Sequence, residues 1–183
     1  MSETDLIIDT RDALDVLLTQ EQIQRRIREL GAQIAQDYAG RDLHVIAVLK
    51  GSFVFLADLV RAIPKDDLSV DFLGLSSYGV STKSSGVVRV TQDLSLPIEG
   101  RNVLVVEDII DTGLTMKYLM DNLETRRPAS LEICTLLHKP DNTEAEVGMK
   151  YIGFTIPNEF VIGYGLDYAE RFRNVPYIGV VRT

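Results

Sequence analysis

The sequence predicts an α/β fold, a doubly wound parallel sheet flanked by helices. Mainly apolar segments, at residues 45–49, 103–106 and 131–137, alternate along the chain with amphipathic helical patterns. Such strands are typical of a parallel sheet buried on both faces, with the intervening helices as its cover. After residue 150 the chain changes to short strand patterns with Gly, Pro and aromatic residues, which predicts a small hood on the main sheet.

The composition describes one domain of ordinary size. The chain has 183 residues, with 19 basic and 27 acidic side chains and a formal net charge of −8. We expect a single domain over residues 1–183, with its core at about 20–150 and the hood formed by about 1–19 and 151–183. The negative charge disfavours general binding to nucleic acid or to an anionic membrane.

The chain has one cysteine, Cys134, so it cannot form an internal disulfide, and no Cys/His cluster accompanies it as a zinc site. We expect Cys134 to be a small buried apolar residue. The first residues are acidic where a secretory signal is basic, and no apolar segment approaches the roughly 18 residues that span a bilayer. These features predict a cytoplasmic protein without membrane association.

The first helix is expected over about residues 20–39. Thr19 and Gln22 fit a capping box, and apolar residues then recur three or four positions apart until Gly40. The strand at 45–49 follows.

A short loop, residues 50–52, leads from this strand into a second helical pattern that begins at Phe53 and stops before Pro64. The same strand, loop and helix order returns at 103–106, and its helix carries apolar residues on one face. The segment 131–137 is the next strand.

A strand is expected at 70–77, followed by a polar segment with two glycines and four serine or threonine residues up to Gly86. This composition is typical of an exposed hairpin tip and also of a mobile lid over a site. After residue 150, the expected strands lie at 160–164 and 177–181.

Three carboxylates stand at the end of the central strand pattern: Glu107, Asp108 and Asp111. Open α/β sheets bind ligands at the carboxyl ends of their strands. Carboxylates at this density repel one another unless they are solvated, or unless a divalent cation or a polyhydroxylated ligand lies among them. Oxygen ligands suit Mg²⁺.

The next residues begin a helix with Thr112, Gly113, Leu114 and Thr115. Free backbone N–H groups at a helix N-terminus favour a phosphate group, and glycine allows its close approach. Together with the carboxylates, this loop fits a sugar phosphate. The alternative is that Asp111 or Thr112 only caps the helix while the acids face water.

The apolar strand, two acids, two apolar residues and Asp-Thr-Gly-x-Thr together resemble the phosphoribosyl-diphosphate (PRPP) motif of type I phosphoribosyltransferases. The chain has neither G-x-x-x-x-G-K-[ST], the signature of nucleoside triphosphatases, nor G-x-G-x-x-G, the signature of Rossmann dehydrogenases. Residues 49–52, 77–78, 137–139 and 160–173 narrow the resemblance to the hypoxanthine (hypoxanthine-guanine) phosphoribosyltransferases. It runs in order along essentially the whole chain, although several members have Lys at the position of Leu114.

The resemblance implies the type I phosphoribosyltransferase fold and an enzyme of purine salvage. Its reaction is the Mg²⁺-dependent transfer of the 5-phosphoribosyl group from PRPP to hypoxanthine, and to guanine, giving IMP or GMP and pyrophosphate. The resemblance also implies a homodimer or a homotetramer.

The family motif assigns roles to the acidic loop. Asp111 is the candidate general base for the purine N7 proton. Glu107 and Asp108 bind the ribose hydroxyls, directly or through Mg²⁺. The 5′-phosphate is held by four residues: Thr112, Gly113, Leu114 and Thr115.

Pyrophosphate is expected to lie between Lys50, Gly51 and Arg173, and the family allows a cis peptide between Leu49 and Lys50. Asp167 resembles the ligand of a second Mg²⁺ on the pyrophosphate side. An arginine at position 173 suits pyrophosphate binding, because its guanidinium makes bidentate contacts with phosphate oxygens.

Lys139 resembles the residue that donates to the purine O6, a contact that disfavours adenine. Phe160 stacks on the purine and Val161 offers backbone hydrogen bonds. Ser77 and Tyr78 resemble the start of the family's catalytic lid. A surface lysine and a core phenylalanine are the alternatives for Lys139 and Phe160.

Two other functions remain open. A xanthine-preferring phosphoribosyltransferase fits the same residues, because the sequence does not fix the backbone around the purine 2-position. The pyrimidine attenuation regulators share the fold and bind RNA, but they commonly lack an acid where Asp111 stands. Neither His44 nor His138 falls on a catalytic position of the family.

Overall fold

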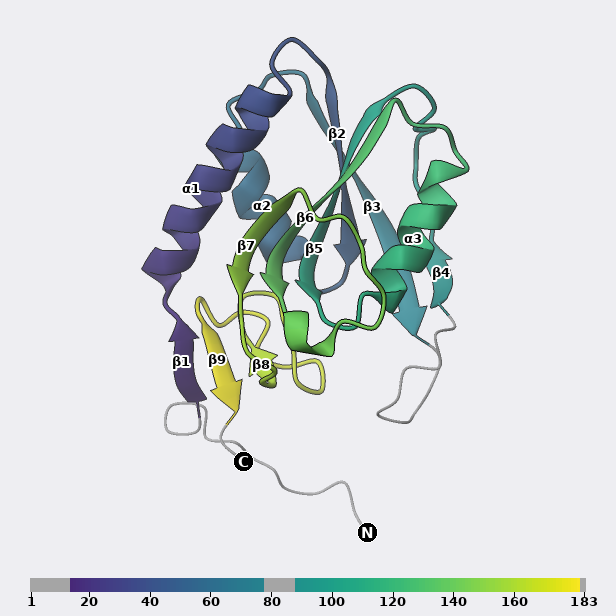
Figure 1. Ribbon diagram of the computed structural model, residues 1–183. Coiled ribbons are helices and arrows are strands. Elements are labelled where there is room, and N and C mark those ends of the chain that lie inside the picture. Colours follow the sequence, from purple (N-terminus) through teal and green to yellow (C-terminus); the bar gives the residue numbers. More distant parts are fainter. Residues whose placement is uncertain (1–13, 78–87, 182–183) are drawn as a thin grey trace.

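The computed structural model describes residues 14–77 and 88–181. The strands of the main sheet are β2 (Leu43–Leu49), β3 (Leu68–Ser77), β4 (Val88–Gln92), β5 (Asn102–Ile110), β6 (Ser130–His138) and β7 (Tyr151–Thr155). They lie in the order β4-β3-β2-β5-β6-β7, and only β4 is antiparallel to its neighbour. The predicted parallel sheet is thus confirmed (Figure 1).

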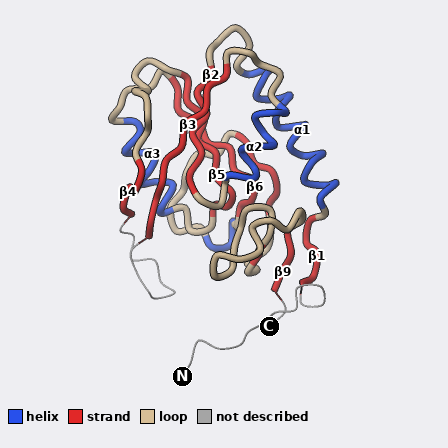
Figure 2. Tube along the Cα trace, turned by 180° about the vertical axis from the view of Figure 1, so that it is seen from behind, coloured by secondary structure: helices blue, strands red, loops and turns tan. Residues whose placement is uncertain are grey.

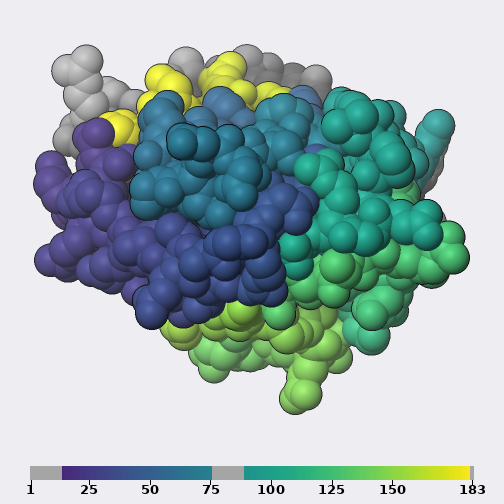
Figure 3. All heavy atoms as spheres, turned by 90° about the horizontal axis from the view of Figure 1, so that it is seen from above, coloured from purple at the N-terminus to yellow at the C-terminus, as the bar shows by residue number. Residues whose placement is uncertain are grey.

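Helices cover both faces of this sheet. α1 (Gln20–Asp37) and α2 (Phe53–Ala62) pack on one face, and α3 (Leu114–Glu124) lies on the other (Figure 2). Successive residues of β2 alternate between the two hydrophobic clusters, since Val45 contacts the α1 and α2 side and Ile46 the α3 side. The doubly wound prediction is correct, and Figure 3 shows the purple and blue first half packed against the teal and green segments.

The start of α1 agrees with the sequence pattern. Thr19 Oγ1 accepts a hydrogen bond from the Gln22 backbone N–H, and Gln22 Oε1 accepts one from the Thr19 N–H. These bonds satisfy two backbone donors that the first turn leaves unpaired. The helix ends at Asp37, two residues earlier than expected.

Both ends of the described chain meet in a second, antiparallel sheet. It consists of β1 (Leu14–Leu18), β9 (Ile178–Val181) and β8 (Val161–Ile162), in that order. Figure 1 shows it beside the carboxyl ends of the parallel strands. This small sheet is the structure's counterpart of the expected hood, and the strand expected at 160–164 is shorter.

The boundary of the hood differs from the expectation. β7 was expected to belong to the hood, because it follows residue 150, but it pairs in parallel with β6 and forms an edge of the main sheet. Tyr151 is fully buried in the cluster beneath α1 and α2, and this burial favours the position in the main sheet. Periodicity alone does not report which neighbour a short strand pairs with.

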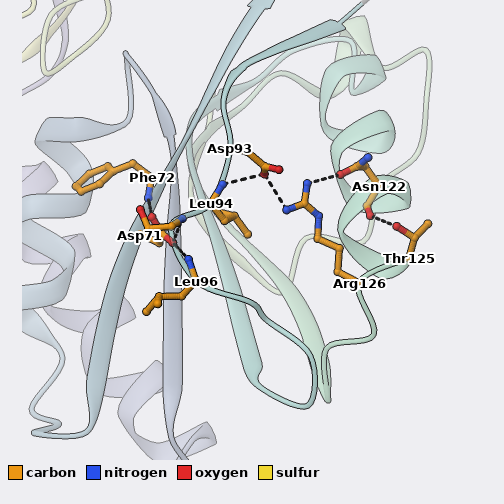
Figure 4. A network of polar contacts seen from close by, with 9 residues as sticks. Asp71, Phe72, Asp93, Leu94, Leu96, Asn122, Thr125 and Arg126 are labelled. Atoms are coloured by element: carbon orange, nitrogen blue, oxygen red, sulfur yellow. Dashed lines mark hydrogen bonds and ion pairs between the residues drawn. The ribbon is translucent and has the colours of Figure 1, made fainter.

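β3 and β4 form a hairpin, with Ser77 opposite Val88. Residues 78–87, which include Tyr78 and the whole polar segment up to Gly86, lie outside the described residues. The chain after β4 is anchored by the buried Asp71 carboxylate, which accepts hydrogen bonds from the backbone N–H groups of Ser95 and Leu96 (Figure 4).

Within the described residues, none of the helices combines the length and the apolar character that a membrane span needs.

Candidate active site

The two acids expected after the central strand lie within it. β5 continues to Ile110, beyond the predicted end at residue 106, because its pairing with β6 extends as far as Ile110 opposite His138. Asp108 is buried with 7% of its surface exposed, and Glu107 is partly buried. Asp111 is the first residue after the strand.

The pair Glu107 and Asp108 is electrostatically unusual. Burial raises the pKa of Glu107 well above its usual value, and the neighbouring Asp108 carboxylate raises it further. Burial also raises the pKa of Asp108, although hydrogen bonds from Glu107 and from the Ile109 N–H oppose this. Oε2 of Glu107 is buried and has no hydrogen-bond partner in the described structure. An unpaired buried oxygen is costly, so this pair is suited to a cation or a hydroxyl donor.

The loop after β5 encloses a pocket of about 170 Å³. Gly113, which precedes α3, has a φ of 81°, and a Cβ there would lie 2.2 Å from the carbonyl oxygen of Ala145. Only glycine fits both constraints. The pocket is lined by Glu107, Ile109, Ile110, Asp111, Thr112, Gly113, Thr115 and Met116.

Asp111 does not cap α3. Its Oδ2 lies 3.4 Å from Nζ of Lys139, and its Oδ1 accepts a 2.7 Å hydrogen bond from Asn142 Nδ2. Lys139 is only 7% exposed, so the surface-lysine alternative is wrong. Sequence reasoning did not identify Asn142, because an amide in a polar loop carries no local signal of its partner. Thr112 Oγ1 accepts a long 3.4 Å hydrogen bond from the Leu114 N–H.

The loop between β2 and α2 meets β5 at Gly51. The Leu49–Lys50 peptide is cis. A Cβ on Gly51 would lie 1.7 Å from Oδ2 of Asp108, and the Gly51 carbonyl oxygen lies 2.1 Å from the Cβ position of Gly165. Gly51 is therefore enclosed by the acidic strand on one side and by the segment after β8 on the other.

The segment after β8 brings Arg173 to the same place. Its guanidinium lies 2.8 Å from Oδ1 of Asp167 and donates to the Gly165 carbonyl oxygen. Glu170 pairs with Lys50 at 3.0 Å and with Arg173 at 3.5 Å. Sequence reasoning did not select Glu170; its position between Asp167 and Arg173 was the available signal.

Phe160 has 54% of its surface exposed, so it is not a core residue. Its ring meets Tyr168 edge to face, with 5.8 Å between the centroids. Val161 is buried in β8. Ser77 ends β3, and Tyr78 is not among the described residues.

Comparisons with known proteins agree with this arrangement. A family model described as a phosphoribosyl transferase domain matches residues 14–169. The hypoxanthine-guanine phosphoribosyltransferase of Mycobacterium avium is 54% identical over 176 residues, covering 93% of this chain and 86% of that protein. The Dictyostelium discoideum protein of that name is 49% identical over 171 residues, covering 92% and 95%.

The chain is also similar to a solved structure. The crystal structure of a hypoxanthine phosphoribosyltransferase from Staphylococcus aureus superimposes with a TM-score of 0.90 at 48% sequence identity. The alignment covers 94% of this chain and 93% of that one. The similarity therefore extends over both sheets and over the residues around β5.

Proposed function

The chain belongs to the phosphoribosyltransferase family, and from this we propose that it is an enzyme of purine salvage. It transfers the 5-phosphoribosyl group of PRPP to hypoxanthine or guanine, giving IMP or GMP and pyrophosphate. The observation that best supports this reaction is the pairing of Lys139 with Asp111 next to the carboxylates of β5.

Asp111 is the general base of the proposed mechanism. As the C1′–O bond of PRPP breaks and the purine N9 bonds to C1′, the N7 proton passes to the Asp111 carboxylate. Lys139 donates to the purine O6, which favours 6-oxopurines because the amino group of adenine is a donor at this position. The exposed ring of Phe160 stacks on the purine, and Val161 offers its backbone groups.

The 5′-phosphate lies in the pocket over the loop between β5 and α3. Backbone N–H groups at the start of α3 and the hydroxyls of Thr112 and Thr115 are its donors. Gly113 keeps this entry free of a side chain, and Leu114 contributes only its backbone. The ribose hydroxyls are bound by Glu107 and Asp108.

Magnesium fits the Glu107 and Asp108 pair. Both side chains offer only oxygen, and the buried Oε2 of Glu107 lacks a partner in the described structure. Two carboxylates are enough for Mg²⁺, which binds through one or two carboxylates and completes its shell with waters and substrate phosphates. When bound, the ion neutralises charge on the diphosphate.

The pyrophosphate group is held by Lys50, Gly51 and Arg173. Asp167 is assigned to a second Mg²⁺ on this side, for which it would release its 2.8 Å contact with Arg173. Charge-assisted contacts of lysine and arginine stabilise the leaving group as its negative charge develops.

Further features of the proposal concern the whole protein. Ser77 and Tyr78 begin a lid that excludes water from the oxocarbenium-like centre. The enzyme acts in the cytoplasm as a homodimer or homotetramer and does not bind nucleic acid.

The direct test is product formation from PRPP and Mg²⁺ with hypoxanthine, guanine, xanthine and adenine in parallel. We expect turnover of hypoxanthine or guanine that falls sharply in Asp111→Asn. Faster turnover of xanthine would support the xanthine-preferring alternative. If no purine reacts while PRPP still binds, the transferase assignment is wrong. Titration with RNA at near-physiological salt then tests whether the chain is an RNA-binding regulator of the same fold.

A further inference from the structure

Asn142 is the second partner of Asp111. It ends the short 3₁₀ turn Pro140–Asn142 that follows β6. Its Nδ2 lies 2.7 Å from Asp111 Oδ1 and 2.6 Å from Asn158 Oδ1. Because a carboxylate only accepts hydrogen bonds, the amide nitrogen is the atom that faces Asp111.

Backbone hydrogen bonds on both sides hold Asn142 in this position. The Lys139 N–H donates to the carbonyl oxygen of Ile110 at 3.0 Å. The N–H groups of Glu144 and Ala145 donate to the carbonyl oxygen of Thr112 at 2.9 and 3.0 Å. The residues before and after Asn142 are thus tied to the residues before and after Asp111.

The two oxygens of Asp111 have different partners. Asn142 engages Oδ1 with a short hydrogen bond, whereas Oδ2 faces the Lys139 ammonium at 3.4 Å, which is long for such a contact. When Lys139 turns to the purine O6, Asp111 retains the bond from Asn142. Oδ2 is then the oxygen available to the purine.

We propose that Asn142 is a positioning residue that orients Asp111, so that Oδ2 receives the purine N7 proton. This inference rests on the proposed role of Asp111 as general base. The proton moves from N7 to Oδ2 while the N9–C1′ bond forms and the C1′–O bond to pyrophosphate breaks. The amide fixes the orientation of the carboxylate by donating to Oδ1, and it takes no part in the transfer itself.

The bond from Asn142 to Asn158 extends this support. Asn158 lies two residues before Phe160, on the segment that carries the purine-stacking ring. The amide of Asn102 makes the same type of bond, from its Nδ2 to Oδ1 of Asp42 at 3.1 Å, but at the start of β5 and not at its end. Asn102→Ala is therefore the matched control. We expect its rate to stay within about threefold of the unchanged enzyme.

The experiment measures the single-turnover rate of nucleotide formation, together with the dissociation constant of PRPP. We expect Asn142→Ala to slow the rate about tenfold with unchanged PRPP binding, because a hydrogen bond to a charged group is lost. Asn142→Asp keeps the size of the side chain, but its carboxylate repels Asp111. The single-turnover rate of this variant should therefore be as low as that of Asn142→Ala, or lower. In the background of Asp111→Asn, replacing Asn142 should have no further effect.

Other results would overturn the inference in distinguishable ways. A normal rate in Asn142→Ala and Asn142→Asp, with a slow Asp111→Asn enzyme, would remove the positioning role and leave the base assignment standing. If the fold-losses in rate of the two single variants multiply in the double variant, Asn142 acts independently of Asp111. A normal rate in Asp111→Asn would overturn both the inference and the proposed base. Thermal unfolding of each variant verifies that it is folded.

Discussion

The Lys50 ammonium lies 3.0 Å from the Glu170 carboxylate, so a cation assigned to pyrophosphate already has an internal anion as its partner. The other oxygen of Glu170 faces Arg173 at 3.5 Å. The hydrogen bond from Lys50 also lowers the pKa of Glu170, which keeps this side chain ionised. The carboxylate therefore competes with an incoming anion for both cations.

We predict that Glu170→Gln binds pyrophosphate more tightly, by about two- to tenfold, because the exposed ion pairs that must break are weak. Calorimetric titration with Mg²⁺-pyrophosphate measures this. Glu21→Gln, the same charge change in the first turn of α1, is the control and should leave the affinity unchanged. Weaker binding by Glu170→Gln would mean that Glu170 holds the cations in place for the ligand instead.

Gly51→Ala is expected to reduce kcat/KM by about a hundredfold or more. The new Cβ would lie 1.7 Å from Oδ2 of Asp108, so the loop or the carboxylate must shift by about an ångström. Steady-state kinetics with PRPP as the varied substrate test this. Gly148→Ala is the matched control, since no atom lies within 4 Å of its Cβ position. Equal activity of the two variants would show that the contact between Gly51 and Asp108 is unimportant.

Lys139→Gln is expected to lower kcat/KM for hypoxanthine by about a hundredfold and to reduce the preference for hypoxanthine over adenine. The amide offers both a donor and an acceptor, so it accommodates either group at position 6 of the purine. Parallel assays with the two bases measure the ratio. Lys117→Gln, which removes an exposed lysine paired with Asp121, is the control. An unchanged ratio would place the discrimination elsewhere.

The burial of His44 leads to a prediction of how the free energy of unfolding depends on pH. The ring is fully buried, and its Nε2 has no hydrogen-bond partner in the described structure. Burial lowers the pKa of His44 below 6.5, and the positive charge of Arg101 lowers it further. The unfolded chain therefore takes up a proton at a higher pH than the folded protein does. His44 contributes its full stabilisation above about pH 6.5 and loses it as the pH falls toward the lowered value.

The corresponding measurement is the free energy of unfolding at about pH 7.5 and about pH 5.5. His44→Leu should show a smaller loss between the two than the unchanged protein does. In His138→Leu the original loss should persist, because His44 is still present. The same loss in all three proteins would show that His44 is not responsible.

The sequence by itself determined the features that depend on neighbouring residues. The capping box at Thr19 placed the start of α1, because its donors and acceptors are three residues apart. Apolar runs located the buried strands, and the residue order from Glu107 to Thr115 carried the resemblance to the phosphoribosyltransferases. Fold class, family and the acidic loop could all be predicted from such local patterns.

Only the tertiary structure decided which distant residues meet. Asn142 and Asp111 are 31 positions apart, and Lys50 and Glu170 are 120 apart, so no local pattern predicts either contact. Strand order placed β7 in the main sheet and not in the hood. The physical reason is common to these cases: packing and strand pairing are set by the whole core, whereas capping and periodicity are set within a few turns of chain.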